Sequence, residues 1–249
     1  MKIVWMVLMV TFRLAAAAEQ YSLETLQKQL SKSPSYTYPY VNLAKELASQ
    51  GQSVLKLFAY GSLIDKNSAK KTFSEKTLNT SRPSLAFGVQ RLFNRDVPIQ
   101  QSAWWGKPLD PQARGMLNLK ATEYQRQFVN GVLIEIPLEE IGALLAREVG
   151  YDLKPVLIAD WNTLLKGELL LSIAYTLIAG PTSSYVNASI LPRPGYYELT
   201  RNAAAEFGPL FSLFWLHTTY MADGKTPIIE WENQRQKKDP KIDYIGWSP

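Results

Sequence analysis

The chain has 249 residues, 46% of them hydrophobic and 20% charged, which is an ordinary globular composition for one large domain or two small ones. Its formal net charge is +5, but lysines and arginines are spread along the chain, and the one dense run, "RQKKDPK", lies in a polar C-terminal stretch. We therefore expect no nucleic-acid partner. The absence of cysteine excludes thiolate nucleophiles, disulfides and cysteine-based zinc sites, and a single histidine argues against a Ser-His-Asp triad or a multi-histidine metal site.

Residues 1–18 have the features of a secretory signal peptide. A basic Lys2 precedes the apolar stretch Ile3–Phe12, and a run of small residues follows, with cleavage expected after Ala17 or Ala18. The alternative is an uncleaved anchor, but this apolar stretch is too short to span a bilayer. We expect an exported protein, periplasmic or secreted, without stable membrane insertion after cleavage.

The remaining chain divides into a helical N-terminal extension (19–52), a main domain (53–231) and a polar C-terminal tail (232–249). In the main domain, the β-prone segments are "SVLKLFAY", "PSLAFGVQRLFN", "GMLNLKAT", "QFVNGVLIEIP", "KPVLIAD" and "ELLLSIAYTLIAG". Helices are expected for "PLEEIGALLAREVG", which Pro137 opens, and for "RPGYYELTRNAAAEFG", which Gly208 closes, while "PLFSLFWLHTTY" fits either type. Because the strands show no regular βαβ alternation, we predict an α+β fold with a small mixed, barrel-like sheet.

One carboxylate lies on the apolar side of a predicted helix. With Ile141 as the origin of a helical wheel, Leu144 falls at about −60° and Glu148 at about −20°, whereas Arg147 falls on the polar face at about −120°. Burying an unpaired carboxylate costs several kcal/mol, and desolvation raises its pKa toward the range in which it can exchange a proton near neutral pH. Two alternatives stay open: the helix ends early, near Gly150, and leaves Glu148 at the surface, or Glu148 forms a structural ion pair.

The segment "FAYGSLID" places a Gly-Ser turn directly after a buried strand. The backbone N–H groups of Tyr60, Gly61, Ser62 and Leu63 could face an anion or a developing oxyanion, because glycine allows close approach to the backbone. An ordinary tight connection is the alternative. The glycine patterns of dinucleotide and nucleoside-phosphate loops are absent from the sequence.

Taken in order, several segments resemble the γ-glutamylcyclotransferase family over roughly residues 54–222. They are "FAYGSLIDKNSAKKT", "FGVQRLFN", "RGMLNL", "NGVLIEI", "REVGYDLKPV" and "LPRPGYYELTRNAAAEFG". The resemblance implies a small mixed-sheet, barrel-like α+β domain with a pocket at one end. Asp65 follows the turn where the glutathione-specific branch typically has an aromatic residue, so that branch is not assigned.

The resemblance also implies an activity. A γ-glutamyl peptide or amine would cyclise to 5-oxoproline and release its amine, with Glu148 as the catalytic acid/base and no metal or other cofactor. The turn would hold the γ-glutamyl group; its residues are Tyr60, Gly61, Ser62 and Leu63. Arg91 could bind a carboxylate of the substrate, and Tyr151 could orient Glu148. For Arg91, a structural salt bridge is the simpler interpretation. The alternative function is that of a non-catalytic protein of the same fold, which binds a γ-glutamyl compound or another small ligand.

Two further predictions concern aromatic surroundings. The neighbourhood of His217, "SLFWLHTTY", is apolar and predicts a hydrogen-bonded imidazole in the core. Trp104 and Trp105 could form a lid over the pocket, although packing at the edge of the domain is the simpler interpretation.

Overall fold

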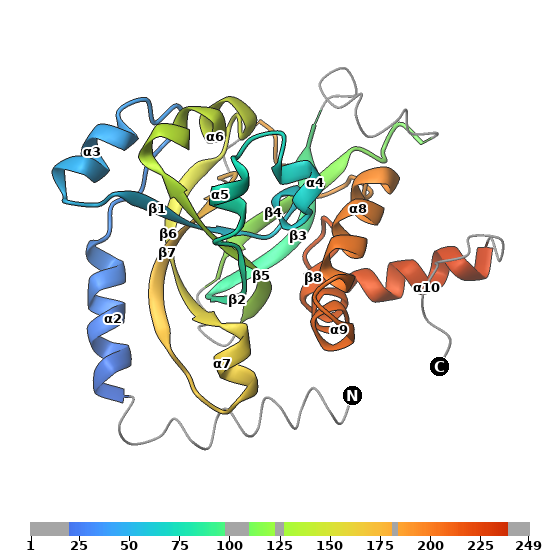
Figure 1. Ribbon diagram of the computed structural model, residues 1–249. Coiled ribbons are helices and arrows are strands. Elements are labelled where there is room, and N and C mark those ends of the chain that lie inside the picture. Colours follow the sequence, from blue (N-terminus) through green and yellow to red (C-terminus); the bar gives the residue numbers. More distant parts are fainter. Residues whose placement is uncertain (1–19, 98–109, 123–126, 181–183, 239–249) are drawn as a thin grey trace.

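A closed five-stranded barrel forms the centre of the protein. The computed structural model describes residues 20–97, 110–122, 127–180 and 184–238 (Figure 1). The barrel order is β1-β5-β2-β6-β7, with β1 and β7 parallel and the other neighbours antiparallel. Its strands are β1 (Val54–Ala59), β2 (Arg82–Phe87), β5 (Phe128–Pro137), β6 (Asp152–Asp160) and β7 (Leu171–Ile178). The predicted α+β fold with a mixed, barrel-like sheet is thus confirmed.

A second, three-stranded sheet of order β4-β3-β8 lies beside the barrel. It consists of β3 (Val89–Asp96), β4 (Gly115–Ala121) and β8 (Thr219–Tyr220). β3 runs antiparallel to β4, with an irregularity in register between Leu92 and Arg95, and parallel to β8. The segment "PSLAFGVQRLFN" therefore contributes to both sheets. Its chain direction changes at Gly88, whose φ of 72° favours glycine.

The strand β5 explains why the barrel closes tightly. Its residues 129–134 are all buried, and it pairs with both β1 and β2. A Cβ added at Gly131 would collide with the carbonyl oxygen of Ala59 and with the ring of Phe58. Glycine at this position therefore allows β1 and the Phe58 ring to approach the backbone of β5.

Helices cover the barrel on several sides. In Figure 1, α2 and α3 lie on one flank and α8, α9 and α10 on the opposite one, while α7 lies near one end of the barrel. The bounds are α2 (Gln20–Lys32), α3 (Leu43–Ser49), α4 (Lys66–Ala69), α5 (Glu75–Leu78), α6 (Ile141–Arg147), α7 (Trp161–Leu165), α8 (Pro194–Ala205), α9 (Pro209–Thr218) and α10 (Ile228–Lys238), with the 3₁₀ turns η1 (Ser62–Ile64) and η4 (Leu138–Glu140).

Several boundaries differ from the sequence expectation. Pro137 does not open a helix: it ends β5, opposite Val54, and the chain passes through η4 before the short helix α6 begins at Ile141. The ambiguous segment "PLFSLFWLHTTY" becomes helix α9 followed by β8. The predicted boundary between main domain and tail, after residue 231, falls inside α10. There the largely buried Glu232 pairs with Arg201 at 2.9 Å.

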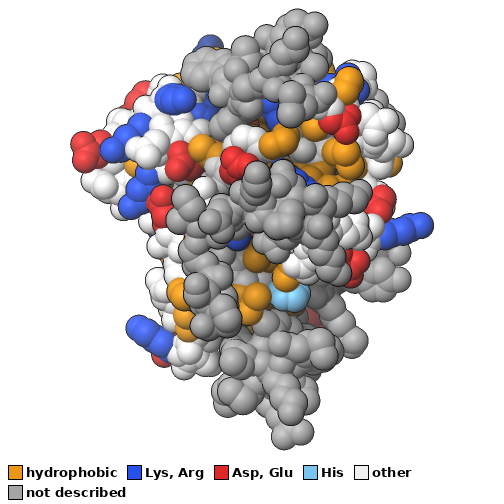
Figure 2. All heavy atoms as spheres, turned by 90° about the vertical axis from the view of Figure 1, so that its right-hand side faces the viewer, with side chains coloured by type: hydrophobic (Ala, Val, Ile, Leu, Met, Phe, Trp, Pro, Cys, Tyr) orange, Lys and Arg blue, Asp and Glu red, His pale blue; other side chains and the backbone are white. Residues whose placement is uncertain are grey.

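The prediction of a core histidine is wrong. His217 lies near the end of α9 with an exposed side chain, shown in pale blue in Figure 2. The helix buries other residues of the same segment, Phe211, Phe214 and Trp215, and turns this position outward. Where Figure 2 shows described side chains, acidic and basic groups lie scattered over that face.

None of the helices in the described part of the chain combines the length and the hydropathy needed to cross a bilayer. The expected signal peptide, residues 1–18, lies outside the described residues, as do Trp104 and Trp105.

Candidate active site

The turn after β1 brings backbone atoms close to a tyrosine from a distant helix. The chain leaves the barrel at Ala59, passes Tyr60 and Gly61, and enters the 3₁₀ turn η1, which the Ile64 N–H closes by donating to the Gly61 carbonyl at 2.9 Å. A Cβ built on Gly61 would lie only 2.6 Å from the hydroxyl of Tyr196. Glycine at this position therefore allows the close approach of the Tyr196 hydroxyl to the backbone.

Glu148 is the first residue after helix α6, and its side chain still faces inward. Its N–H donates to the carbonyl of Leu144 at 2.9 Å, so the last helical hydrogen bond fixes its direction. Leu144 and Ile141, on the same stripe, are buried, and the Glu148 side chain is only 14% exposed. The helix does end early, as one alternative proposed. Glu148 nevertheless stays buried, because the chain turns only at Gly150, with φ 78°.

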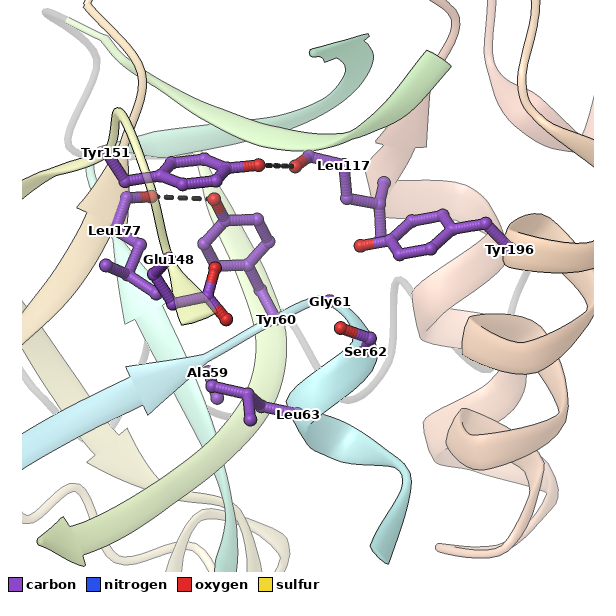
Figure 3. A pocket seen from close by; sticks show the side chains of 10 residues that line it. All are labelled: Ala59, Tyr60, Gly61, Ser62, Leu63, Leu117, Glu148, Tyr151, Leu177 and Tyr196. Atoms are coloured by element: carbon purple, nitrogen blue, oxygen red, sulfur yellow. Dashed lines mark hydrogen bonds between the residues drawn. The ribbon is translucent and has the colours of Figure 1, made fainter. Parts of the chain in front are cut away.

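These two elements meet at one pocket. Figure 3 shows the Glu148 carboxylate directed toward the turn, with the Tyr151 ring on one side and Tyr196 entering from α8. The cavity has a volume of about 300 Å³, counting its open mouth. Its lining consists of Ala59, Tyr60, Gly61, Ser62, Leu63, Leu117, Glu148, Tyr151, Leu177 and Tyr196.

Tyrosines form the polar parts of the pocket wall. The Tyr60 hydroxyl donates to the carbonyl of Leu177 at 2.7 Å, and the Tyr151 hydroxyl donates to that of Leu117 at 3.0 Å. Burial raises the pKa of Tyr60, Tyr151 and Tyr196 above the usual range of a phenol, and these groups stay neutral at physiological pH. Among the residues that line this pocket, Glu148 then remains as the acidic group that can carry a charge.

The charge of Glu148 is subject to opposing effects. Burial raises the pKa of its carboxyl. The guanidinium of Arg147 lowers this pKa through its charge and a hydrogen bond, and the charge of Arg95 also lowers it. The burial effect wins, and the pKa lies above the ordinary value of a glutamate. A carboxyl with a raised pKa is suited to accept and return a proton.

The two arginines near Glu148 were not identified as site residues from the sequence. Arg147, placed on the polar face by the helical wheel, instead turns toward the segment 62–72 and pairs with Glu148, Nε to Oε1, at 3.1 Å. Arg95 is 4% exposed, lies over the rings of Tyr151 and Tyr185 at 4.7 and 4.1 Å from their centroids, and donates to the Val149 carbonyl. Arg147 begins the motif "REVGYDLKPV", and Arg95 directly follows the motif "FGVQRLFN".

Arg91 does not reach the pocket. It is fully buried at the junction of β3, β5 and α9, where its guanidinium donates to the backbone and side-chain oxygens of Asn130, to Thr219 and to the Trp215 carbonyl. Burial lowers its pKa to about 9, so the group remains a cation at neutral pH. Its position corrects the expectation that it contacts a substrate carboxylate. Arg91 also does not form the salt bridge that we considered as the alternative, because its partners in the described part of the chain are uncharged oxygens and the Trp215 ring.

The other sequence-selected residues do gather around one cavity: the turn residues Tyr60 to Leu63, Glu148 and Tyr151 all line it. Tyr196 joins them unforeseen, although it lies in the motif "RPGYYELT". The fold and site together define an α+β barrel protein with a carboxylate enclosed in a small, tyrosine-walled pocket.

Comparisons with known proteins place solved γ-glutamyl cyclotransferases among the structures to which this chain is similar. A γ-glutamyl cyclotransferase is 14% identical over 79% of this chain and 94% of its own, with a TM-score of 0.44. A yeast γ-glutamyl cyclotransferase specific to glutathione is 15% identical over 66% and 95%, with a TM-score of 0.45. YkqA from Bacillus subtilis is 18% identical with a TM-score of 0.48; the match covers 68% of this chain but only 55% of YkqA. No protein-family model and no curated protein sequence matches the chain.

Proposed function

We propose that the protein is a γ-glutamylcyclotransferase-type enzyme, which converts γ-glutamyl peptides or amines to 5-oxoproline and a free amine. The observation that carries this proposal is the pocket itself. The two motifs selected from the sequence, the turn 60–63 and Glu148, face each other across one small cavity, although they are separated by more than 80 residues of chain.

The reaction is an intramolecular acyl transfer. The α-nitrogen of the γ-glutamyl group attacks its own γ-carbonyl carbon, a five-membered lactam forms, and the bond to the leaving nitrogen breaks. Over the cycle the attacking nitrogen loses two protons and the leaving nitrogen gains two, and Glu148 is placed to carry them one at a time. Holding the substrate in a bent conformation would supply rate by proximity, for which a small pocket with an open mouth is suited.

The turn supplies the complementary polar surface. Backbone N–H groups of residues 60–63 would stabilise either the oxyanion formed at the γ-carbonyl or the α-carboxylate of the substrate. In this structure, the Ser62 backbone N–H is hydrogen-bonded to the Tyr196 hydroxyl, which lowers the pKa of that phenol against the larger effect of burial. The Tyr196 hydroxyl therefore occupies the position that a substrate oxygen would take at this N–H.

The test is direct. Purified protein would be incubated with a panel of γ-glutamyl amino acids and amines, including D and L donors, and 5-oxoproline would be measured by mass spectrometry against a protein-free control. We expect product from at least one donor and its loss in Glu148→Gln. Turnover that survives this substitution would remove the mechanism, and saturable donor binding without turnover would indicate the non-catalytic binding protein instead.

We also propose that the protein is exported, on the basis of the signal-peptide features of residues 1–18. Fractionation of expressing cells, with the N-terminal mass of the recovered protein, tests this. A product that begins at residue 18 or 19 outside the cytoplasm is expected, and an intact N-terminus in the cytoplasm would contradict it.

A further inference from the structure

Arg147 has a hydrogen-bond arrangement that is unusually complete for a side chain at a helix end. Its Nε–H donates to Glu148 Oε1 at 3.1 Å, and its two terminal nitrogens donate to the Ser62 hydroxyl, the Ser68 hydroxyl, the Ser68 carbonyl and the Thr72 hydroxyl at 2.8 to 2.9 Å. A guanidinium has five N–H donors, and these five bonds use them all.

The acceptors of Arg147 lie on the segment that forms the opposite wall of the pocket. Ser62 begins η1, and Ser68 lies in α4, whose first turn is capped by the buried Asp65 through the Ser68 N–H at 2.6 Å. The Arg147 side chain, 19% exposed, therefore joins the end of α6 to a segment about 80 residues earlier in the chain. A solvated ion pair between neighbouring residues would need none of these additional bonds.

We propose that Arg147 is a positioning residue, which locks the Glu148 carboxylate to the η1–α4 segment and so sets the geometry between the proton carrier and the turn. The inference rests on the proposed function and deepens it. The forked Arg147 guanidinium donates to Glu148 through Nε and to the η1–α4 segment through its two terminal nitrogens. A movement of either pocket wall therefore breaks hydrogen bonds to the other. Lysine has three donors on one atom and cannot reproduce this fork.

Other charged or titratable groups also face Glu148 and remain in place when Arg147 is replaced. Arg95 contributes from β3. Neutral phenols approach from four places: Tyr60 from the turn, Tyr151 from the position before β6, Tyr196 from α8 and Tyr40 from the segment before α3. A change in the titration of Glu148 in an Arg147 variant can thus be assigned to the loss of the guanidinium.

The experiment compares wild type with Arg147→Met, Arg147→Lys and the control Arg82→Met. Arg82 forms a half-exposed ion pair with Glu135 on the barrel at 3.0 Å, and neither residue lines the pocket. We expect kcat for 5-oxoproline formation to fall about 10²-fold in Arg147→Met, with a smaller change in KM. The acidic limb of the rate profile should move to higher pH, because the charge that lowers the pKa of Glu148 is gone. Arg147→Lys should return the limb toward its wild-type position but recover only part of kcat, and Arg82→Met should change neither.

A second measurement does not depend on turnover. Titration of ¹³C-labelled glutamate carboxyls by NMR, with the Glu148 signal assigned from its absence in Glu148→Gln, should show the pKa of Glu148 raised in Arg147→Met. If wild type forms no 5-oxoproline, the proposed function fails. The titration still tests whether the Arg147 guanidinium contacts the Glu148 carboxylate. An unmoved acidic limb and an unmoved Glu148 titration in folded Arg147 variants would overturn the inference.

Discussion

Replacement of Gly61 by alanine tests whether the turn and Tyr196 are fitted to each other. The added Cβ would lie 2.6 Å from the Tyr196 hydroxyl, so this oxygen has to retreat by about 0.8 Å to reach an ordinary contact of about 3.4 Å. The Tyr196 residue is 5% exposed and its ring packs edge-on against Phe93 at 6.4 Å between centroids, so the shift disturbs this packing or moves the hydroxyl into the pocket. We expect Gly61→Ala to lower the free energy of unfolding by about 1–3 kcal/mol and the rate of cyclisation by about 10²-fold.

A double-mutant cycle identifies the cause. Tyr196→Phe removes the oxygen that collides with the new Cβ, so Gly61→Ala should destabilise the Tyr196→Phe background by less than it destabilises wild type. The control is Gly142→Ala in α6, where an added Cβ meets nothing within 4 Å; there alanine should be neutral or stabilise by up to about 1 kcal/mol. Urea denaturation gives the stabilities. Equal costs of Gly61→Ala in both backgrounds, or no cost at all, would refute the fitted contact.

Three further outcomes are expected. Because burial raises the pKa of Glu148, the folded state binds its proton more tightly, and wild-type stability falls as pH rises between the ordinary and the raised value. Glu148→Gln should therefore match wild type in urea denaturation at about pH 4 and exceed it at about pH 8, and equality at both would contradict this. Arg91→Met should cost on the order of 3 kcal/mol, since buried oxygens such as that of Asn130 lose their donor, while KM stays unchanged; a raised KM in a stable variant would restore Arg91 to the site. Gly131→Ala should cost roughly 3 kcal/mol or prevent folding, because the carbonyl of Ala59 cannot move aside, and a normally stable variant would show that β1 and β5 are less closely packed than described.

The strands of the barrel were predictable from sequence because each carries its own local signal. The run 128–136 reads as a strand from its apolar residues alone, and it is one. The closure of the barrel was not available in the same way, because it depends on long-range pairs such as Phe58 opposite Thr176, and β-register between distant segments leaves no local pattern. His217 was misplaced because an apolar sequence neighbourhood does not determine whether one particular position of a helix faces the core or the solvent.

In the site, the helical wheel found Glu148 because a carboxylate on an apolar stripe contradicts the local pattern, and such contradictions often mark functional positions. The same wheel misplaced Arg147, since it describes the direction in which a side chain leaves the helix and not where a long, flexible arginine ends. Arg91 was misjudged for a related reason. Nothing local distinguishes an arginine that binds a ligand from one whose guanidinium is held by backbone, amide and hydroxyl oxygens inside the protein.

The placement of Glu148 reconciles two requirements that oppose each other. Burial alone would keep the carboxyl protonated and so unable to accept a proton, whereas an arginine pair in open solvent would hold it ionised and a weak base. Here burial and the Arg147 guanidinium act on the same group with opposite sign, and burial prevails. Because Arg147 also holds Ser62 and Ser68, the group that moderates the proton affinity of Glu148 is the one that fixes the opposite wall, so that removing this side chain changes geometry and basicity together.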